Sequence, residues 1–299
     1  MVQRLTVLTF NIGFCGGWNG LVDGVQPADV VVDRLNSIGA LIADSDADVV
    51  FLQEVDVRSR RSAYVNQVDF LTKSLGYKYF DFATVWKNSW VPFPITWKIS
   101  RHFGPVHACN LILSRYPIIY SAHHELPQRS DKGWLYRHFY LTQVLQDCVI
   151  CLPSQTVRLA HLHLDAFNRD TRCDQLRVAL AQFPSQRDTP LIIGGDLNSV
   201  GYHPGDLWFP DDPENNYGED VTLSLLDQAG FKRMRPIHGE GESSLFDFPA
   251  SCPNRALSQL WSRGTLGTGY AIHPGMASDH CGIFSEFLIS GVDHRPGLE

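Results

Sequence analysis

Polar residues stand where hydrophobic, strand-like runs of this sequence end. Carboxylates, carboxamides and a histidine occupy these ends in four short segments. Such groups are expensive to bury unless they bind something. If the four ends converge on one sheet edge, they would suit a metal-dependent site for a phosphorylated substrate. The segments are Thr9-Phe10-Asn11, Leu52-Gln53-Glu54, Gly195-Asp196-Leu197-Asn198 and Ser278-Asp279-His280.

The first two segments offer oxygen ligands for a metal. Glu54 follows the apolar run DVVFLQ, and its carboxylate suits Mg²⁺, which favours carboxylate, water and phosphate oxygens. Asn11 follows VLTF, and its carboxamide can bind the same metal or orient an attacking water. Taken alone, each has an ordinary explanation, as an exposed glutamate or a turn-forming asparagine. The functional interpretation is favoured because the other segments accompany them.

Asp196 and Asn198 lie two residues apart in the run IIGGDLNS. Alternate residues of an extended segment point the same way, so both side chains can face one site. The two glycines before Asp196 let the backbone approach a ligand closely. A β-turn closed by Asx caps is the alternative, and it is the weaker interpretation beside the other segments.

The dipeptide Asp279-His280 stands just before the last strand-like run, CGIFSEF. The pKa of a histidine lies near neutrality, so His280 can contact a phosphate or act as a general acid or base. Asp279 would lie on the metal side or order the neighbouring groups. A bare Asp-His dipeptide is a weak signal, but its position before the terminal strand makes it specific.

Taken in order, these segments resemble the motifs of the endonuclease/exonuclease/phosphatase superfamily, which includes DNase I-like nucleases, neutral sphingomyelinases and inositol polyphosphate phosphatases. The resemblance runs from about residue 5 to residue 287. It implies two mixed β-sheets packed face to face and flanked by helices, a four-layer α/β sandwich; the alternating pattern alone indicates only α/β. The segment CNLILSRYPI around Asn110 resembles the GNAILSRYPI of the sphingomyelinase-like branch, with Cys109 in place of glycine.

The resemblance implies a role for each candidate. Glu54 would be the principal ligand of Mg²⁺, or of Mn²⁺, with Asn11 and Asp279 also on the metal side. Asp196 would position or activate the water that attacks phosphorus. The groups that hold the phosphate and its developing charge would be Asn11, Asn110, Asn198, His163 and His280.

His161 and His163 share one face of the run RLAHLHL. Alignment to the superfamily's THL motif places the catalytic histidine at His163 and leaves His161 as a structural residue. An HxH pair can also indicate zinc, but no third nitrogen or sulfur ligand lies at a useful spacing.

One segment departs from the superfamily pattern. Many members carry an IDYI segment whose aspartate orients the final histidine, but residues 257–261 here read LSQLW, with Ser258 at that position. A carboxylate raises a histidine's pKa and fixes its tautomer, whereas serine can orient the ring without supplying charge. We therefore expect either a substitute carboxylate, with Asp247 the candidate, or a His280 that stays neutral and works mainly as a donor.

Composition and charge bound the possibilities. The 299 residues are 44% hydrophobic and 19% charged, typical of a globular chain, and we expect one domain over residues 1–299. A net charge of −7 argues against a broad basic surface for nucleic acid but not against a local basic groove. Seven cysteines fit reduced thiols, and the sequence contains no signal-peptide pattern and no run long enough for a spanning helix. We expect a cytoplasmic protein, with no obligate protein partner evident.

Hydrophobic periodicity predicts alternating strands and helices. Strands are expected at residues 4–11, 48–54, 77–86, 108–114, 138–150, 156–164, 191–195 and 281–288. Helices are expected at 29–45, 62–75, 170–183 and 221–229, and loops at 13–24, 86–105 and 201–220, with a frayed tail from Ser290.

The stretch 86–105, WKNSWVPFPITWKISRHFGP, is predicted to be a long aromatic loop because its prolines exclude a regular helix. Exposed Trp and Phe suit contact with a membrane surface. An equal alternative is that these aromatics fold back as a loop that caps the core. Aromatic side chains also stack on single-stranded bases, which keeps nucleic acid as a possible partner.

Three functions follow, from two classes. The leading hypothesis is an Mg²⁺-dependent phosphoesterase that hydrolyses a phosphodiester, with a lipid-like or small phosphodiester favoured by the acidic balance and the aromatic loop. A DNA or RNA nuclease of the same superfamily is the alternative. It predicts a cluster of Lys87, Lys98, Arg101 and His102 beside the site. A catalytically inactive binding module is the third, and Ser258 is its main support.

Overall fold

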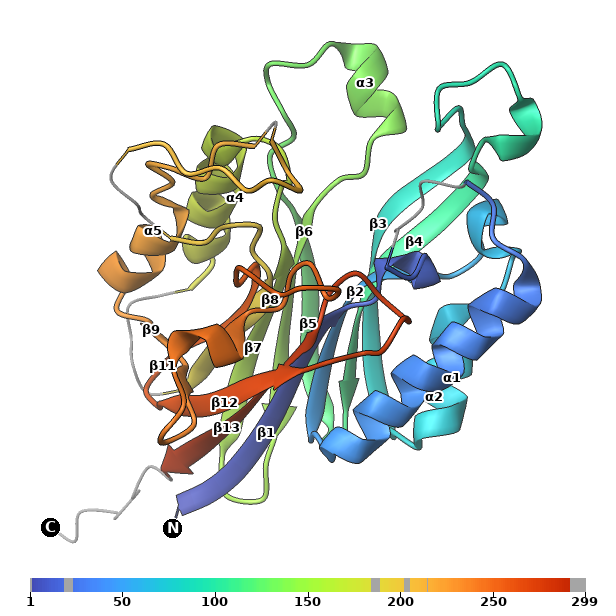
Figure 1. Ribbon diagram of the computed structural model, residues 1–299. Coiled ribbons are helices and arrows are strands. Elements are labelled where there is room, and N and C mark those ends of the chain that lie inside the picture. Colours follow the sequence, from blue (N-terminus) through green and yellow to red (C-terminus); the bar gives the residue numbers. More distant parts are fainter. Residues whose placement is uncertain (1, 19–23, 184–188, 202–204, 214, 291–299) are drawn as a thin grey trace, which may run out of the picture.

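The computed structural model describes residues 2–18, 24–183, 189–201, 205–213 and 215–290. Two mixed β-sheets, one of seven strands and one of six, pack face to face, and helices cover their outer faces (Figure 1). The expected four-layer α/β sandwich is confirmed. The predicted tail after Ser290 and parts of the 13–24 and 201–220 loops lie outside the described residues.

The seven-stranded sheet has β1 (Val2–Asn11) at its centre. The run VLTF is buried on both sides of this strand, as is usual for a strand covered on both faces. β1 pairs antiparallel with β13 (Gly282–Ser290) and parallel with β2 (Val49–Asp56). The other strands are β3 (Tyr79–Val91), β4 (Gly104–Ser114), β10 (Arg235–Pro236) and β12 (Gly267–Ile272), in the order β10-β12-β13-β1-β2-β4-β3.

The six-stranded sheet repeats the central parallel pair. β7 (Thr156–His163) runs parallel to β8 (Leu191–Asp196), and β8 pairs antiparallel with β11 (Ser258–Arg263). The remaining strands are β5 (Ile118–Glu125), β6 (Val144–Cys151) and β9 (Lys232–Arg233), in the order β5-β6-β7-β8-β11-β9.

Three hydrophobic layers hold the sandwich together. One packs α1 (Ala28–Ser45) and α2 (Gln67–Leu75) against the seven-stranded sheet, and a second joins the two sheets. A third packs α4 (Arg169–Leu180) and α5 (Thr222–Gln228) against the six-stranded sheet. Burial of these apolar faces supplies the main driving force for the fold. In the described part of the chain, no helix combines the length and apolar character needed to cross a membrane.

The predicted 86–105 loop is too long. β3 continues to Val91 and β4 already begins at Gly104, so the irregular segment covers residues 92–103 and includes one 3₁₀ turn, Ile99–Arg101. Pro105 is tolerated inside β4 because β2 pairs with β4 only as far as Ala108, and neither β2 nor β3 has a residue in register with Pro105. We use "aromatic loop" below for residues 92–103.

Two other boundaries differ from the predictions, and five strands were missed. α2 begins at Gln67 rather than at residue 62 because Asn66 caps it, its side chain accepting a bond from the Asp69 amide at 3.0 Å. The predicted 138–150 strand begins at Val144, since residues 134–139 form the short helix α3 (Trp134–Phe139). The strands β5, β9, β10, β11 and β12 were not predicted.

Candidate active site

The two parallel strand pairs deliver polar side chains to one end of the sandwich. Asn11 ends β1 and pairs with Gln53 of β2, while His163 ends β7 and pairs with Asp196 of β8. Parallel neighbours end at the same sheet edge, so each sheet contributes adjacent polar groups. The face-to-face packing of the sheets then places the two sets opposite each other.

Asn11 connects the two sets. Its buried Nδ2 donates to Glu54 Oε1 at 3.2 Å and to Asp196 Oδ2 at 2.9 Å. Its Oδ1 accepts a bond from the Gly13 amide at 3.0 Å, which fixes the orientation of the carboxamide. Asn11 therefore bridges the two carboxylates as a donor and holds them at a set spacing.

A β-bulge aims Glu54. The β2–β4 pairing shifts register between Leu52 and Val55, and Glu54 has a left-handed φ of 57°. A bulge re-aims a side chain that regular alternation would place elsewhere. Burial raises the pKa of Glu54, and nearby Asp279 adds to the rise, against the opposing effects of His163, Asn11 and His280. The strained backbone and the desolvated carboxylate are both typical of a ligand-binding position.

Asp196 is held at the end of β8 by its surroundings. Its Oδ1 accepts a bond from the Asn198 amide at 3.0 Å, and Asn198 Nδ2 donates to the Leu164 carbonyl at 3.0 Å. Gly195 precedes it with a φ of 136°, and a Cβ there would meet the Leu162 carbonyl oxygen at 1.8 Å. Only glycine lets β7 and β8 approach this closely beside the site.

Two imidazoles flank Asp196. His163 Nε2 lies 3.8 Å from Asp196 Oδ2 and 3.9 Å from Glu54 Oε1. His280 Nε2 lies 3.7 Å from the same Asp196 oxygen. Asp196 therefore lies between two imidazole donors. A carboxylate in this position can take a proton from a water, while both histidines face a negatively charged substrate.

Asp247 supplies to His280 the carboxylate that the serine at position 258 lacks. Its buried Oδ2 accepts a bond from His280 Nδ1 at 2.9 Å, and its Oδ1 accepts from the amides of Leu257 and Ser258 at 2.6 and 3.1 Å. The Ser258 hydroxyl finds no partner among the described residues. The expectation of a substitute carboxylate at Asp247 is therefore confirmed.

The hydrogen bond to Asp247 favours a charged His280 over the neutral alternative. Burial lowers the pKa of His280, but the hydrogen bond that the ring donates to Asp247 and the charges of Asp196 and Asp279 outweigh it and raise that pKa to about 10. The ring is therefore protonated at neutral pH and can donate from Nε2 toward the site.

Glu54 and Asp279 fit a divalent cation. Asp279 Oδ1 lies beside Gly13, where an added Cβ would meet it at 2.8 Å, and burial raises the pKa of Asp279. Burial raises the pKa of both carboxylates, and the charge of Asp279 raises that of Glu54 further, so a cation beside them would stabilise their charged forms. No group of three or more His, Cys, Asp or Glu among the described residues is arranged as a metal cluster. Mg²⁺ is commonly held by one or two carboxylates with water and substrate phosphate, and two carboxylates match that ligand preference.

The model of the endonuclease/exonuclease/phosphatase family matches residues 8–280. The chain belongs to the endonuclease/exonuclease/phosphatase family. Its members are hydrolases that cleave phosphate esters, among them nucleases and phosphatases. No curated protein matches the chain.

Solved structures of family members share the fold. An endonuclease/exonuclease/phosphatase from Beutenbergia cavernae superposes with a TM-score of 0.66 at 19% identity, over 96% of this chain and 72% of that one. A family protein from Leptotrichia buccalis gives 0.64 at 13% identity, over 95% and 99%. Humanized D. rerio TDP2 gives 0.58 at 16% identity, over 95% and 98%. These similarities extend to the fold and leave the substrate open.

The contacts link every predicted site residue except Asn110. Asn110 lies on β4 opposite Ala83, fully buried, and neither its Nδ2 nor its Oδ1 finds a partner among the described residues. A buried carboxamide without partners is unfavourable and calls for an explanation. The predicted role in phosphate binding would provide one.

His161 is structural, as expected. It stacks on Phe51 at 4.9 Å between ring centroids and lies between Gln53 and Gln146, with ring nitrogens 2.6 and 3.1 Å from their side chains. Burial, with the charge of His163, lowers the pKa of His161 to about 3, so the ring is neutral. Gln53 and Gln146 belong to different sheets, and His161 therefore joins the two sheets through a polar bridge.

Tyr140 was not among the predicted site residues. This residue follows α3, stacks on Tyr136 at 5.0 Å, and its pKa is raised by burial and by the charges of Asp165 and Glu54 among others. Its region was predicted to be a strand, so no motif drew attention to it. Tyr140 places the segment after α3 within electrostatic reach of Glu54.

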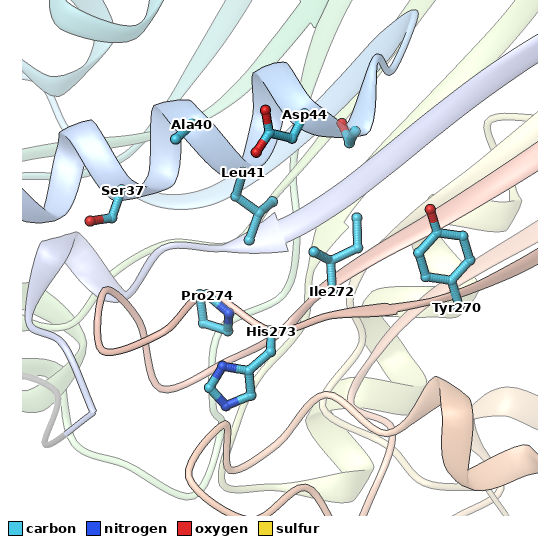
Figure 2. Close-up of a pocket in the computed structure, with 9 residues that line it drawn as sticks. Ser37, Ala40, Leu41, Asp44, Tyr270, Ile272, His273 and Pro274 are labelled. Atoms are coloured by element: carbon cyan, nitrogen blue, oxygen red, sulfur yellow. The ribbon is translucent and has the colours of Figure 1, made fainter.

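A separate cavity lies elsewhere in the molecule. It has a volume of about 480 Å³ and lies between α1 and β12, with Leu41 and Ile272 on facing sides (Figure 2). None of the predicted site residues lines it. The candidate active site is therefore a different feature, formed at the strand ends.

Proposed function

We propose that this protein is a metal-dependent phosphodiesterase in which water attacks phosphorus in line with the leaving oxygen. The observation that carries the proposal is the position of Asp196, between the imidazoles of His163 and His280 and joined to Glu54 through Asn11. A base, two donors and a carboxylate for a metal thus meet in one place.

Glu54 and Asp279 would hold Mg²⁺, or Mn²⁺, with Asn11 ordering Glu54. When bound, the metal would polarise the scissile phosphate and stabilise the leaving oxygen. Oxygen donors and the electrostatic coupling between the two carboxylates support this assignment.

The side chains divide the remaining work. Asp196 orients the attacking water and takes up its proton on Oδ2, since its Oδ1 is held by the Asn198 amide. His280 donates from Nε2 to a phosphate oxygen, and Asp247 keeps the proton on Nδ1. His163, Asn198 and Asn110 bind the other phosphate oxygens as negative charge develops, whereas both N–H groups of Asn11 are already donated to Glu54 and Asp196.

A lipid-like or small phosphodiester is the favoured substrate. The net charge of −7 disfavours a long polyanion, and exposed hydrophobic side chains lie on the aromatic loop. The nuclease alternative is supported by Lys98 and Arg101 of the same loop, both exposed. The inactive-module alternative loses its main support because Asp247 takes the role expected of residue 258.

The test is hydrolysis in Mg²⁺ with and without chelator, on plasmid DNA, phospholipid vesicles and bis-p-nitrophenyl phosphate in parallel. We expect chelator-sensitive turnover that Glu54→Ala and Asp196→Ala each abolish, and that Glu240→Ala, a change of an exposed glutamate, leaves intact. The preferred substrate decides between the lipid enzyme and the nuclease. Turnover that survives both site substitutions, or folded protein without turnover on any substrate, contradicts the proposal.

A further inference from the structure

Two projecting segments carry exposed hydrophobic side chains. On the aromatic loop, Trp97 is fully exposed and Ile95 is 93% exposed, with Ile99 also exposed. On α3, Trp134 is 73% and Leu135 55% exposed. Scattered exposed apolar residues are ordinary, but two groups of large ones at projecting tips are the usual mark of an interaction surface. The capping-loop alternative holds for Phe103, which is buried and packs with Phe14 and Val91, but not for the exposed tip around Trp97.

The two segments project from the same end of the molecule (Figure 1). Hydrogen bonds join them at their base. Trp86 Nε1 donates to the Phe139 carbonyl at 3.0 Å, and Asn88 Nδ2 donates to the His138 carbonyl at 2.7 Å. Because β3 carries Trp86 and Asn88 and continues into the aromatic loop, it fixes the two tips relative to each other.

The same base reaches the candidate active site. The Trp86 ring packs edge-on against Phe14, with 6.5 Å between the ring centroids. Phe14 follows Gly13, whose amide holds the Asn11 side chain. On the other side, Tyr140 follows α3 and lies within the electrostatic influence of Glu54. A surface that engages both tips would therefore lie next to the site.

The charge of the tips is opposite to that of the whole chain. Residues 86–105 contain Lys87, Lys98 and Arg101 and no acidic residue. Residues 127–141 contain Arg129, Lys132 and Arg137 against a single acidic residue, Asp131. The chain as a whole carries a formal charge of −7. Aromatic and aliphatic side chains interleaved with basic ones match the polar-apolar boundary of an anionic membrane.

We propose that the aromatic loop and α3 together form a surface that binds an anionic lipid bilayer and presents the strand-end site to phosphodiesters of lipid headgroups. The second half of this inference rests on the proposed function, whereas the first half does not. Ile95, Ile99 and Leu135 favour a bilayer over single-stranded nucleic acid, because aliphatic side chains gain from apolar burial but offer no ring for base stacking.

The test measures binding of the full chain to vesicles by co-sedimentation. The vesicles contain phosphatidylcholine with an equal part of phosphatidylserine, or phosphatidylcholine alone. We expect preference for the anionic vesicles, weakening in high salt, and a further loss of about tenfold in Ile95→Ser/Trp97→Ser and in Trp134→Ser/Leu135→Ser. The matched control is Leu266→Ser/Leu288→Ser, which changes side chains that are 53% and 56% exposed on other elements.

The control variant should bind as the wild type does. Binding that is unaffected by both tip variants, or reduced equally by the control, overturns the inference. The inference is also overturned if the tip variants lose binding of single-stranded DNA while they still bind vesicles as the wild type does. Glu54→Ala protein should bind vesicles normally, and the tip variants should hydrolyse bis-p-nitrophenyl phosphate normally. Failure of the membrane surface is thereby distinguished from failure of the proposed function.

Discussion

Asp247 Oδ2 accepts a hydrogen bond from His280 Nδ1 at 2.9 Å, across 33 residues of sequence. The carboxylate comes from the segment before β11 rather than from β11 itself, where Ser258 pairs with Asp196. The backbone amides of Leu257 and Ser258 hold Asp247 in place. Compared with the IDYI segment of the superfamily, the carboxylate that orients the histidine therefore comes from an earlier position in this chain. The histidine itself keeps its position before the last strand.

Replacing Asp247 by Asn should lower kcat by about two to four orders of magnitude, with a much smaller change in KM. The amide keeps the shape and can still accept the backbone bonds, but it no longer supplies the charge that holds a proton on His280. Steady-state kinetics on the preferred phosphodiester measure this split.

Ser258→Ala is the matched control for Asp247→Asn. The serine hydroxyl is buried without a partner among the described residues, so its removal should leave kcat within about twofold of wild type. An impaired Ser258→Ala beside an active Asp247→Asn would reverse the assignment of the two residues.

Most of the site could be predicted because its residues directly follow continuous apolar strands. Asn11 and Asp196 end such strands and Glu54 lies near the end of one, and parallel pairing within each sheet places these ends together. The Asp279-His280 pair instead precedes β13, and the antiparallel pairing of β13 with β1 brings it to the same edge. Asp247 is different, since it lies in an irregular segment whose path is set by tertiary contacts. Its sequence surroundings could make it a candidate but could not place it against His280.

Two of the missed strands, β5 and β12, share a physical cause. β5 has an edge position with mostly exposed or half-buried residues, and β12 contains two glycines, so neither has the apolar alternation that indicates a strand. α3 has the opposite problem. Its sequence WLYRHF is aromatic enough to resemble a strand, yet none of its residues is buried.

Mg²⁺ should stabilise the folded protein even in the absence of substrate. Binding to Glu54 and Asp279 would offset two desolvated carboxylates, and a ligand at a hundred times its Kd stabilises by about 2.7 kcal/mol. Thermal unfolding with Mg²⁺ or chelator measures the shift in Tm. The shift should be lost in Glu54→Gln and kept in Glu240→Gln. A shift that persists in Glu54→Gln would place the cation elsewhere.

Gly195→Ala should destabilise the fold by about 3 kcal/mol or more. The new methyl would meet the Leu162 carbonyl oxygen at 1.8 Å and would also strain a backbone φ of 136°, so β7 and β8 would have to separate. Urea unfolding measures the free energy. Gly133→Ala is the control, because a Cβ at that position has open space around it. Equal effects of the two substitutions would contradict the close approach of the strands.

The contact between β3 and β5 predicts a pH-dependent stability. His123 Nε2 lies 2.8 Å from Asp81 Oδ2, and this hydrogen bond raises the pKa of His123 in spite of partial burial. Although burial opposes it, the bonds from His123 and Gln146 lower the pKa of Asp81. A raised histidine pKa stabilises the fold fully below its ordinary value of 6.5 and ceases to do so as pH rises through the folded value.

The lowered pKa of Asp81 stabilises the fold fully above its ordinary value of 3.8. This stabilisation is lost as pH falls through the value in the folded protein. The pair should therefore contribute most between about pH 4 and pH 6.5, by less than about 1 kcal/mol because His123 is partly exposed. Urea unfolding of His123→Gln should show a deficit at about pH 6 that shrinks by about pH 9. His124→Gln, which changes the next histidine along β5, should track the wild type at both values. A deficit that is independent of pH would mean that His123 acts by packing rather than by charge.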